Sequence, residues 1–311
     1  MLFNDYLIID WSAAGKPSPA KPSKDAIWVG HARSEDAVRI ETTYYRIRRS
    51  AMGAITNLLL ELTARNRRVL LGIDAAYAYP HGTNAALGGG GDNAWRTTWQ
   101  LIAGLIEDDA NNANNRYKVA AELNRRMGAP AGPFWGCPAS SSGAFLVPKR
   151  GFSYPVITAD RQVLAERRIV ETRHRRMQPA WKLAYTGSVG SQTLTAIPYL
   201  HGLRFQHETL GPTSRVWPFE TGFSTDPLGE IERTEPTPRP LILHAEIYPS
   251  LVSRPGTDPI PDREQVICLA RHLRRLDREN RLGGFLDRPA NLAPQELEMV
   301  LQEEGWVLGV R

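Results

Sequence analysis

The sequence predicts an α/β fold in which helices flank a mixed sheet. Two observations predict it. Short strand-like runs separated by turn residues open the chain as an antiparallel meander would, and an amphipathic helical segment then leads to a continuous apolar run at 69–74. A run that is apolar throughout is typical of a strand buried on both faces, as parallel strands are. With 311 residues, 42% of them apolar, the chain can bury a sizeable core.

The first half of the predicted core follows from these patterns in order. Strands are expected at 5–11, 26–33 and around 38–47, with a polar turn that contains Pro and Lys between the first two. Ser50 is expected to cap a helix, because apolar side chains then recur at steps of three and four residues: Met52, Ile55, Leu58, Leu59 and Leu62. The strand at 69–74 closes this part of the core.

Residues 81–185 are expected to form a large, mostly helical insertion. The four glycines at 88–91 are typical of a hinge or lid, and helices are predicted near 94–107 and 115–127. We expect the insertion to cover one end of the sheet. Ligand sites usually gather where an insertion lies at the carboxyl ends of the strands.

The chain is predicted to be a single domain, residues 1–311, with a core formed by 1–80 and 186–311. The second part of the core is read from the same patterns. It is expected to contain a helix from 187 to about 203, a short strand at 215–220, a Pro-rich polar loop at 225–240, a strand at 241–248, and helices from 262 to about 277 and near 294–303.

The composition favours an anionic partner. The net charge is +5, and most of the 38 basic residues are Arg, which suits phosphate and carboxylate recognition. Basic clusters at 161–176 and 271–281 also contain acids at helical spacing, which is typical of a solvated helix face. No apolar run reaches the length of a membrane span, and the start lacks a signal-peptide pattern, so a cytoplasmic protein without membrane contact is expected. Cys137 and Cys268 lack the spacing of a disulfide framework or a zinc site.

Three strand-like runs end on a carboxylate, namely Asp10, Asp74 and Glu246. Acids are avoided in buried strand interiors, so an acid that closes an apolar run is expected at the rim of the sheet, facing solvent, a metal or a ligand. Asp262 begins the helix after the third run and can project toward the same rim. The alternative for each acid is a turn or cap, and Asp262 with Gln265 has the capping-box pattern.

Carboxylates clustered on rigid strand ends suit Mg²⁺ or Mn²⁺, which bind oxygen ligands and can polarise a phosphoryl group or activate water. We therefore expect Asp10, Asp74 and Asp262 to be metal ligands and catalytic residues, with Glu246 as a fourth catalytic acid. Glu220 ends another short strand and competes with Glu246 for the same place.

An anionic substrate needs donors beside these acids. Backbone N–H groups of the glycine-containing turn at 187–192 can hold an anion at the start of a helix, although the turn lacks the residue order of a P-loop. The expected substrate-binding residues are Lys182, Arg173, Ser188 and Ser191. His81 and His244 lie close in sequence to the acids and could serve as a base, although a structural histidine is the more common case.

The order of these elements resembles the ribonuclease H-like fold, whose five-stranded mixed sheet, an antiparallel meander plus parallel strands, carries a carboxylate cluster at its centre. The resemblance implies that Asp10, Asp74 and Asp262 stand where nuclease members keep their metal-binding acids. This chain differs from the nuclease-like families in the first helix. Those families commonly carry a further acid there, whereas the acid in this helix is Glu61, which lies among leucines. The paired glycine-rich phosphate loops of sugar kinases and actin-like ATPases are not found in the sequence.

Within that superfamily, short motifs are similar to the domain-of-unknown-function 429 family. They are Gly-Ile-Asp-Ala-Ala-Tyr-Ala-Tyr-Pro at 72–80, the region 182–192, Glu-Ile-Tyr-Pro at 246–249 and the helix that starts at Asp262. In this resemblance Glu246 matches the acid of the family that precedes the end of its strand.

The leading hypothesis is a divalent-metal-dependent hydrolase that acts on a phosphodiester or another phosphorylated anionic substrate, with nucleic acid and nucleotides as candidates. The alternative is a non-catalytic binding protein or adaptor for a small anionic ligand or a partner protein, in which the acids pair with arginines. A third hypothesis is a scaffold that docks a partner chain through the aromatic loop around Phe134 and Trp135, which would expose a contiguous apolar patch.

Overall fold

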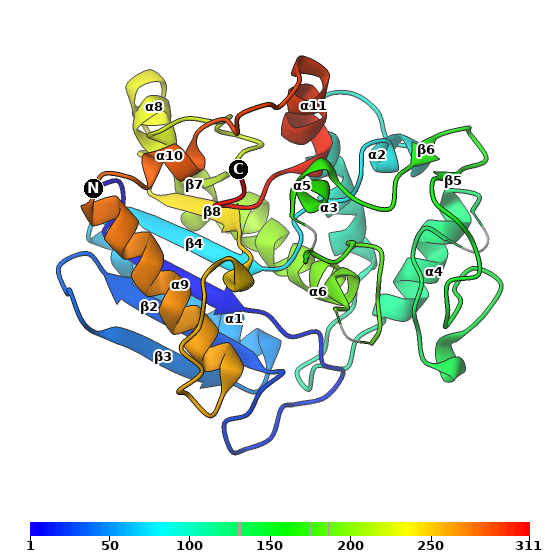
Figure 1. The fold of residues 1–311 in the computed structure, drawn as a ribbon, viewed down its shortest axis with the longest axis horizontal. Coiled ribbons are helices and arrows are strands. Elements are labelled where there is room, and N and C mark those ends of the chain that lie inside the picture. Colours follow the sequence, from blue (N-terminus) through cyan, green and yellow to red (C-terminus); the bar gives the residue numbers. More distant parts are fainter. Residues whose placement is uncertain (130–131, 175, 186) are drawn as a thin grey trace.

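A mixed sheet forms the centre of the computed structural model, which describes residues 1–129, 132–174, 176–185 and 187–311 (Figure 1). Its strand order is β3-β2-β1-β4-β8-β7; β2 runs antiparallel to both neighbours, whereas β1, β4, β8 and β7 are mutually parallel. The strands are β1 (Asp5–Asp10), β2 (Ile27–Arg33), β3 (Ile40–Tyr45), β4 (Val69–Asp74), β7 (Ser214–Val216) and β8 (Ile242–Glu246). Six strands replace the expected five, because the short strand β7 pairs with β8 and extends the sheet.

The two faces of the sheet are covered by different helices. α1 (Arg48–Ala64) and α6 (Val189–His201) pack on the face formed by every second residue of the strands, including Ile9 and Ile73. α9 (Pro261–Arg278) packs on the opposite face, against Ile8 and its neighbours. Figure 1 shows α9 across the front of the sheet and α1 behind it.

α1 begins before the residue that was expected to cap it. Its N-cap is Ile47 rather than Ser50, and no side chain caps it. The reason is Arg48, which is fully buried and whose guanidinium pairs with Asp108 and donates to the carbonyls of Ser12 and Ala14. These bonds fix the loop that follows β1 against the insertion.

The insertion begins as predicted and then departs from the prediction. The expected helices are confirmed as α3 (Ala94–Leu105) and α4 (Arg116–Arg126), and the Trp95 and Trp99 side chains on α3 join the same core as the sheet. Its later part is largely loop, so the expectation of a mostly helical insertion is wrong there. Its other elements are α2 (Thr83–Ala86), η1 (Ala139–Ser141), α5 (Ile169–Arg173) and a short hairpin of β5 (Val156–Ile157) and β6 (Val163–Leu164).

The loop expected at 225–240 contains a helix, α8 (Pro227–Thr234). Asp226 caps it by accepting a hydrogen bond from the Gly229 N–H (3.0 Å), and proline at the first helical position suits this start. The remaining elements are η2 (Gly202–Gln206), α7 (Leu210–Thr213), η3 (Pro249–Leu251), α10 (Gly283–Leu286), α11 (Pro294–Met299) and η4 (Val300–Glu304). Within the described ranges, no helix is both long and apolar enough to cross a membrane.

A glycine in β2 sets how closely α9 approaches the sheet. A Cβ atom on Gly30 would lie 3.0 Å from the Val266 carbonyl oxygen, so a larger residue would push the helix away. At the start of the same helix, the Arg263 guanidinium lies over the Trp28 ring, 5.6 Å from its centroid. Since Trp28 pairs with Asp10, the first turn of α9 lies beside the carboxyl end of β1.

Candidate functional site

The register of the parallel strands brings two of the predicted acids together. Asp10 at the end of β1 is the direct partner of Asp74 at the end of β4. Partner residues of adjacent strands point to the same face, so the two carboxylates are neighbours. Glu246 pairs with Ile73, one position earlier, and therefore points to the opposite face.

Asp262 comes to the same face as Asp10 and Asp74 from the first turn of α9. It is not the N-cap that its capping-box pattern allowed, because the helix starts at Pro261 and its N-cap is Ile260. Instead, its Oδ2 atom accepts a hydrogen bond from the Asp25 N–H at 2.5 Å. The bond fastens the start of the helix to the loop between β1 and β2.

The carboxylates of Asp10 and Asp74 repel each other in a buried setting. Burial and the charges of Asp74 and Asp262 raise the pKa of Asp10 well above its usual range. Burial, Glu246 and Asp262 raise the pKa of Asp74 to about 7. In the part of the chain that the structure describes, no group donates a hydrogen bond to either carboxylate. Such a pair is stabilised by a shared proton or by a cation.

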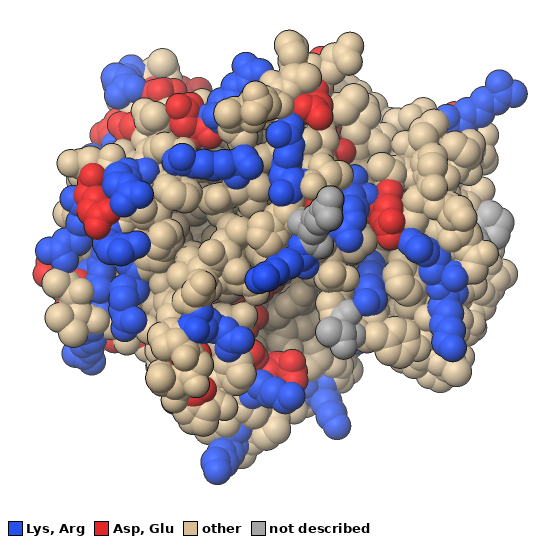
Figure 2. Space-filling view, in the orientation of Figure 1, with Lys and Arg blue, Asp and Glu red and all other residues tan. Residues whose placement is uncertain are grey.

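Asp10 and Asp262 border a cavity of about 720 Å³ between the end of the sheet and the insertion. Acidic, basic and aromatic side chains line it; they include Asp10, Asp25, Asp262, Arg116, Tyr117 and Tyr185. Figure 2 shows the surface hollowed near its centre, with Lys and Arg side chains around the hollow. A smaller cavity of about 200 Å³, lined by Asp74, adjoins it at Gly187 and Gln192.

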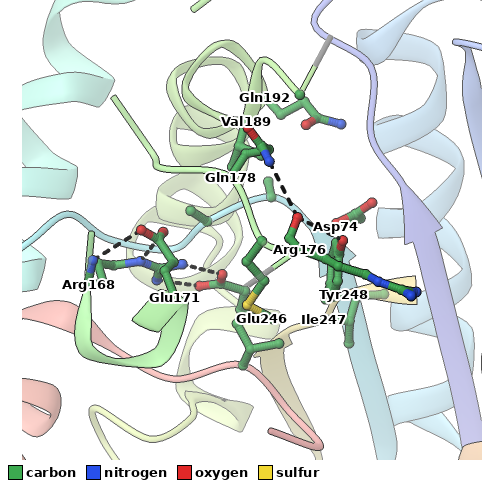
Figure 3. Close-up of a pocket in the computed structure, with 15 residues that line it drawn as sticks. Asp74, Arg168, Glu171, Arg176, Gln178, Val189, Gln192, Glu246, Ile247 and Tyr248 are labelled. Atoms are coloured by element: carbon green, nitrogen blue, oxygen red, sulfur yellow. Dashed lines mark hydrogen bonds and ion pairs between the residues drawn. The ribbon is translucent and has the colours of Figure 1, made fainter. Parts of the chain in front are cut away.

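Glu246 borders the smaller cavity but is held in a buried ion pair (Figure 3). Arg168 donates to both of its carboxylate oxygens, at 2.8 and 2.6 Å, and the Tyr77 N–H donates at 2.8 Å. Glu220, the predicted competitor, is paired in the same way by Arg204, at 2.8 and 2.7 Å. Pairing with arginine therefore distinguishes these two glutamates from the three aspartates, although Glu246 and Asp74 line the same smaller cavity.

Comparison of the chain with models of protein families, with curated proteins and with solved structures finds no match. The chemistry of the site is therefore inferred from its own side chains. Among the described residues, no group of three or more His, Cys, Asp or Glu is arranged to hold a metal ion. The pair of Asp10 and Asp74 nevertheless fits Mg²⁺, which commonly binds one or two carboxylates and takes its other ligands from water and substrate phosphate.

The predicted substrate-binding residues are divided between the cavity and other parts of the molecule. Ser188 and Ser191 line the larger cavity. Arg173 does not line either cavity among the described residues; it donates to the Asn291 carbonyl (2.9 Å) and lies 3.4 Å from Glu296 beside α11.

Lys182 is also outside the described linings of the two cavities, and its ammonium group lies over the Trp135 ring, 5.8 Å from the centroid. Its backbone carbonyl accepts a hydrogen bond from the Gly190 N–H, and the Ser191 N–H donates to the Ser188 carbonyl. Two of the N–H groups expected to hold an anion at the start of α6 are therefore used within the chain.

The solvated helix face that the sequence predicts for each basic cluster is found only in part. In the cluster at 161–176, Arg168 is buried in its ion pairs, α5 is only five residues long, and Arg175 lies outside the described residues. In the cluster at 271–281, the exposed side chains of α9 confirm a solvated face, but Arg274 is buried and donates to the carbonyls of Ala37 and Arg39.

Arg116 is the cavity residue that the sequence did not indicate. It is the first residue of α4, and in the sequence it carries no signal beyond its place at the start of a predicted helix. The fold of the insertion brings it to the cavity that Asp10 and Asp262 also line. Lys24, in the loop before β2, is a second basic residue of this lining.

The two histidines that were candidate bases lie elsewhere. His81 lies 3.0 Å from Glu303, which is near the C-terminus. His244 is 1% exposed in the middle of β8, and neither ring nitrogen has a hydrogen-bond partner among the described residues. Burial and the charge of Arg204 lower the pKa of His244 to about 3, so the ring is neutral.

We expect His244→Leu to stabilise the protein by about 1–2 kcal/mol at pH 7, since a buried polar ring without partners is replaced by an apolar one. The folded pKa lies below the unfolded one, so the wild type loses stability as the pH falls from about 6.5 toward about 3. The gain should therefore grow at pH 5. Urea denaturation at both pH values measures it, and His272→Leu, at a partly exposed position, should shift stability by less than about 0.5 kcal/mol. A destabilised His244→Leu protein at pH 5 would contradict the prediction.

Proposed function

We propose that this chain is a divalent-metal-dependent hydrolase that acts on a phosphodiester or another phosphorylated anionic substrate. Asp10 and Asp74 would be the ligands of Mg²⁺ or Mn²⁺, and Asp262, which the sequence also predicted as a ligand, would add negative charge beside them. One observation carries the proposal: Asp10 and Asp74 are register partners at the carboxyl edge of parallel strands, and no donor among the described residues compensates their charge. Open α/β sheets bind ligands at this edge.

The sheet order supports a ribonuclease H-like core as part of this proposal. β3, β2 and β1 form the antiparallel meander, and β4 and β8 continue it in parallel, which is the arrangement that the resemblance implies. β7 is an additional strand at the edge. We also propose, from the motifs around Asp74 and Glu246, that the chain is related to the domain-of-unknown-function 429 family.

The chain holds the end of β1 in place so that Asp10 can act. Gln192 on α6 donates to the Trp11 carbonyl at 2.7 Å, and the Trp11 indole N–H donates to Thr195 at 3.1 Å. These bonds hold the backbone and the side chain of Trp11, the residue after Asp10, against α6. A bound divalent cation would polarise a phosphoryl oxygen and lower the pKa of water.

Manganese titration tests the proposal. We expect metal-free wild type to bind Mn²⁺ with a dissociation constant below about 1 mM, and Asp74→Asn to weaken binding at least about tenfold, because one of two charged oxygen ligands is lost. Isothermal titration calorimetry at pH 8 measures both, since this pH lies above the pKa of about 7 of Asp74. Asp92→Asn, which changes an exposed acid elsewhere, is the control and should bind as wild type does. Wild-type protein that binds no Mn²⁺ at millimolar concentrations would refute the metal site.

The non-catalytic alternative rests on the acids that are paired with arginine. Glu246 with Arg168 and Glu220 with Arg204 match it, whereas Asp10 does not. Hydrolysis of bis(4-nitrophenyl) phosphate separates the two functions: Mn²⁺-dependent release of nitrophenol that Asp74→Asn abolishes supports the hydrolase, and binding without release supports the adaptor.

The scaffold hypothesis required an exposed aromatic loop. Phe134 is instead 1% exposed, with its ring centroid 4.9 Å from that of Trp181 and 5.3 Å from that of Tyr79. Its ring therefore belongs to the core of the insertion, and we do not propose a partner surface at this loop.

A further inference from the structure

Arg116 presents an unusually well-positioned guanidinium to the larger cavity. Its Nε donates to the Ser191 hydroxyl at 2.9 Å, Nη1 to the Asn114 side chain at 2.8 Å and Nη2 to the Tyr117 hydroxyl at 3.1 Å. The guanidinium also lies over the Tyr117 ring, 4.4 Å from its centroid. A guanidinium has five N–H donors, so two remain without a partner among the described residues.

Ser191 is the residue that fixes this position. It is 2% exposed, and its hydroxyl donates to the Leu183 carbonyl at 2.5 Å, which leaves its oxygen to accept from Arg116. The orientation of the guanidinium is therefore set by a buried group of α6. This arrangement also explains the part of Ser191 in the site: it positions Arg116 rather than contacting a ligand through its hydroxyl proton.

Arg116 keeps its charge without a carboxylate partner in the part of the chain that the structure describes. In the described ranges no carboxylate forms an ion pair with it, in contrast to Arg168 and Arg204, each of which is paired in a bidentate manner. Arg116 is partly buried, and this burial lowers the pKa of its guanidinium. Partly desolvated, unpaired guanidinium groups at a cavity are suited to bidentate recognition of phosphate.

We propose that Arg116 is the phosphate-binding residue of the larger cavity and that the ligand is a phosphate ester of about nucleotide size. The phosphate would bind Arg116 in the cavity that Asp10 and Asp262 also line, with Lys24 as a second cation. A cavity of about 720 Å³ is within the usual range for a ligand of that size.

Tyr185 offers a contact surface for the organic part of the ester. Tyr185 borders the cavity, is 62% exposed and has a positive φ of 69°, which is rare for a bulky side chain and common at ligand-binding loops. Its exposed ring offers an apolar, planar contact beside the phosphate position. The inference deepens the proposed function, because it assigns the substrate class of the same site, but phosphate binding to Arg116 does not require the metal.

Phosphate binding by metal-free protein tests the inference. We expect wild type to bind inorganic phosphate and AMP in the presence of EDTA, with AMP the tighter ligand, and Arg116→Met to weaken both about 10- to 100-fold. Arg116→Lys should retain part of the affinity, since the charge remains but the planar fork is lost. Arg125→Met, at the exposed end of the same helix, is the matched control and should bind as wild type does.

The outcomes separate this inference from the proposed metal site. Arg116→Met is expected to keep the wild-type affinity for Mn²⁺, whereas Asp74→Asn should lose Mn²⁺ and keep phosphate. Equal phosphate affinity in wild type, Arg116→Met and Arg116→Lys would overturn the inference, as would a wild type that binds neither probe at millimolar concentrations. Wild type that binds phosphate through Arg116 but binds no Mn²⁺ would refute the hydrolase and leave the anion site standing.

Discussion

Replacing Arg168 with methionine is expected to lower the free energy of unfolding by about 3–5 kcal/mol, the largest effect of any substitution considered for this protein. Arg168 is 1% exposed and joins Glu246 on β8 to Glu171 on α5 (Figure 3). Burial opposes the charge of Arg168, but Glu246 and Glu171 outweigh it and raise the pKa of the guanidinium. Methionine fills much of the space but leaves two buried carboxylates without a counter-charge.

The same arginine connects three parts of the chain. It donates to the Glu304 carbonyl at 3.1 Å, and the next residue, Ile169, donates its N–H to the Glu304 carboxylate at 2.6 Å. The end of β8, the last part of the insertion and the C-terminal segment are thereby held together. The loss in Arg168→Met should accordingly include the contacts of the C-terminal segment.

Urea denaturation at pH 7 measures this loss. Arg173→Met is the matched control, because Arg173 is partly exposed and its substitution should cost less than about 1 kcal/mol. Adding Glu246→Gln to Arg168→Met should recover part of the stability, since one uncompensated charge is removed. Equal losses in Arg168→Met and Arg173→Met would show that the network does not carry the stability assigned to it.

The second large effect is expected in the pH dependence of the metal-free protein. The pKa values of Asp10 and Asp74 are raised above those of the unfolded chain, by burial first and by the neighbouring acids second. The folded state therefore binds more protons than the unfolded state between about pH 4 and pH 7. The stabilisation from this pair is fully present below about pH 4; the part from Asp74 is lost as the pH rises through about 7, and the part from Asp10 is lost as the pH rises through its own raised pKa.

Asp74→Asn should remove most of this loss. An asparagine cannot ionise, so Asp10 then lacks its nearest like charge, and we expect the variant to exceed wild type by about 2–4 kcal/mol at pH 8 but by little at pH 4. The measurement is urea denaturation of EDTA-treated protein at pH 4, 6 and 8. Taking the difference between variant and wild type at each pH removes the opposing contribution of His244.

Two further arms complete this experiment. Asp92→Asn should follow wild type at every pH, because that acid is exposed. Mn²⁺ at pH 8 should stabilise wild type and leave Asp74→Asn nearly unchanged, since the cation would replace the shared proton between the two carboxylates. If Asp74→Asn is less stable than wild type at pH 8 without metal, repulsion between Asp10 and Asp74 does not destabilise the metal-free folded state.

Much of the backbone could be predicted because the local pattern and the tertiary environment agree. The apolar run at 69–74 and the amphipathic segment that became α9 each suit one structure only, and both formed within a residue or two of the predicted bounds. α8 was missed because its prolines and polar residues indicate a loop, while the cap at Asp226 and the proline at its first position favour a helix. The start of α1 was displaced because the buried contacts of Arg48 outweigh the capping preference of Ser50.

By itself, the sequence determined that Asp10, Asp74 and Glu246 end strands, since an acid closes each apolar run. Only the tertiary structure decided which of them meet. Side chains alternate between the two faces of a sheet, so a shift of one position in register puts Asp10 and Asp74 on one face and Glu246 on the other. Register depends on pairing between strands far apart in the chain. The approach of Arg116 to the same cavity likewise depends on how the insertion folds back over the sheet, which no local pattern specifies.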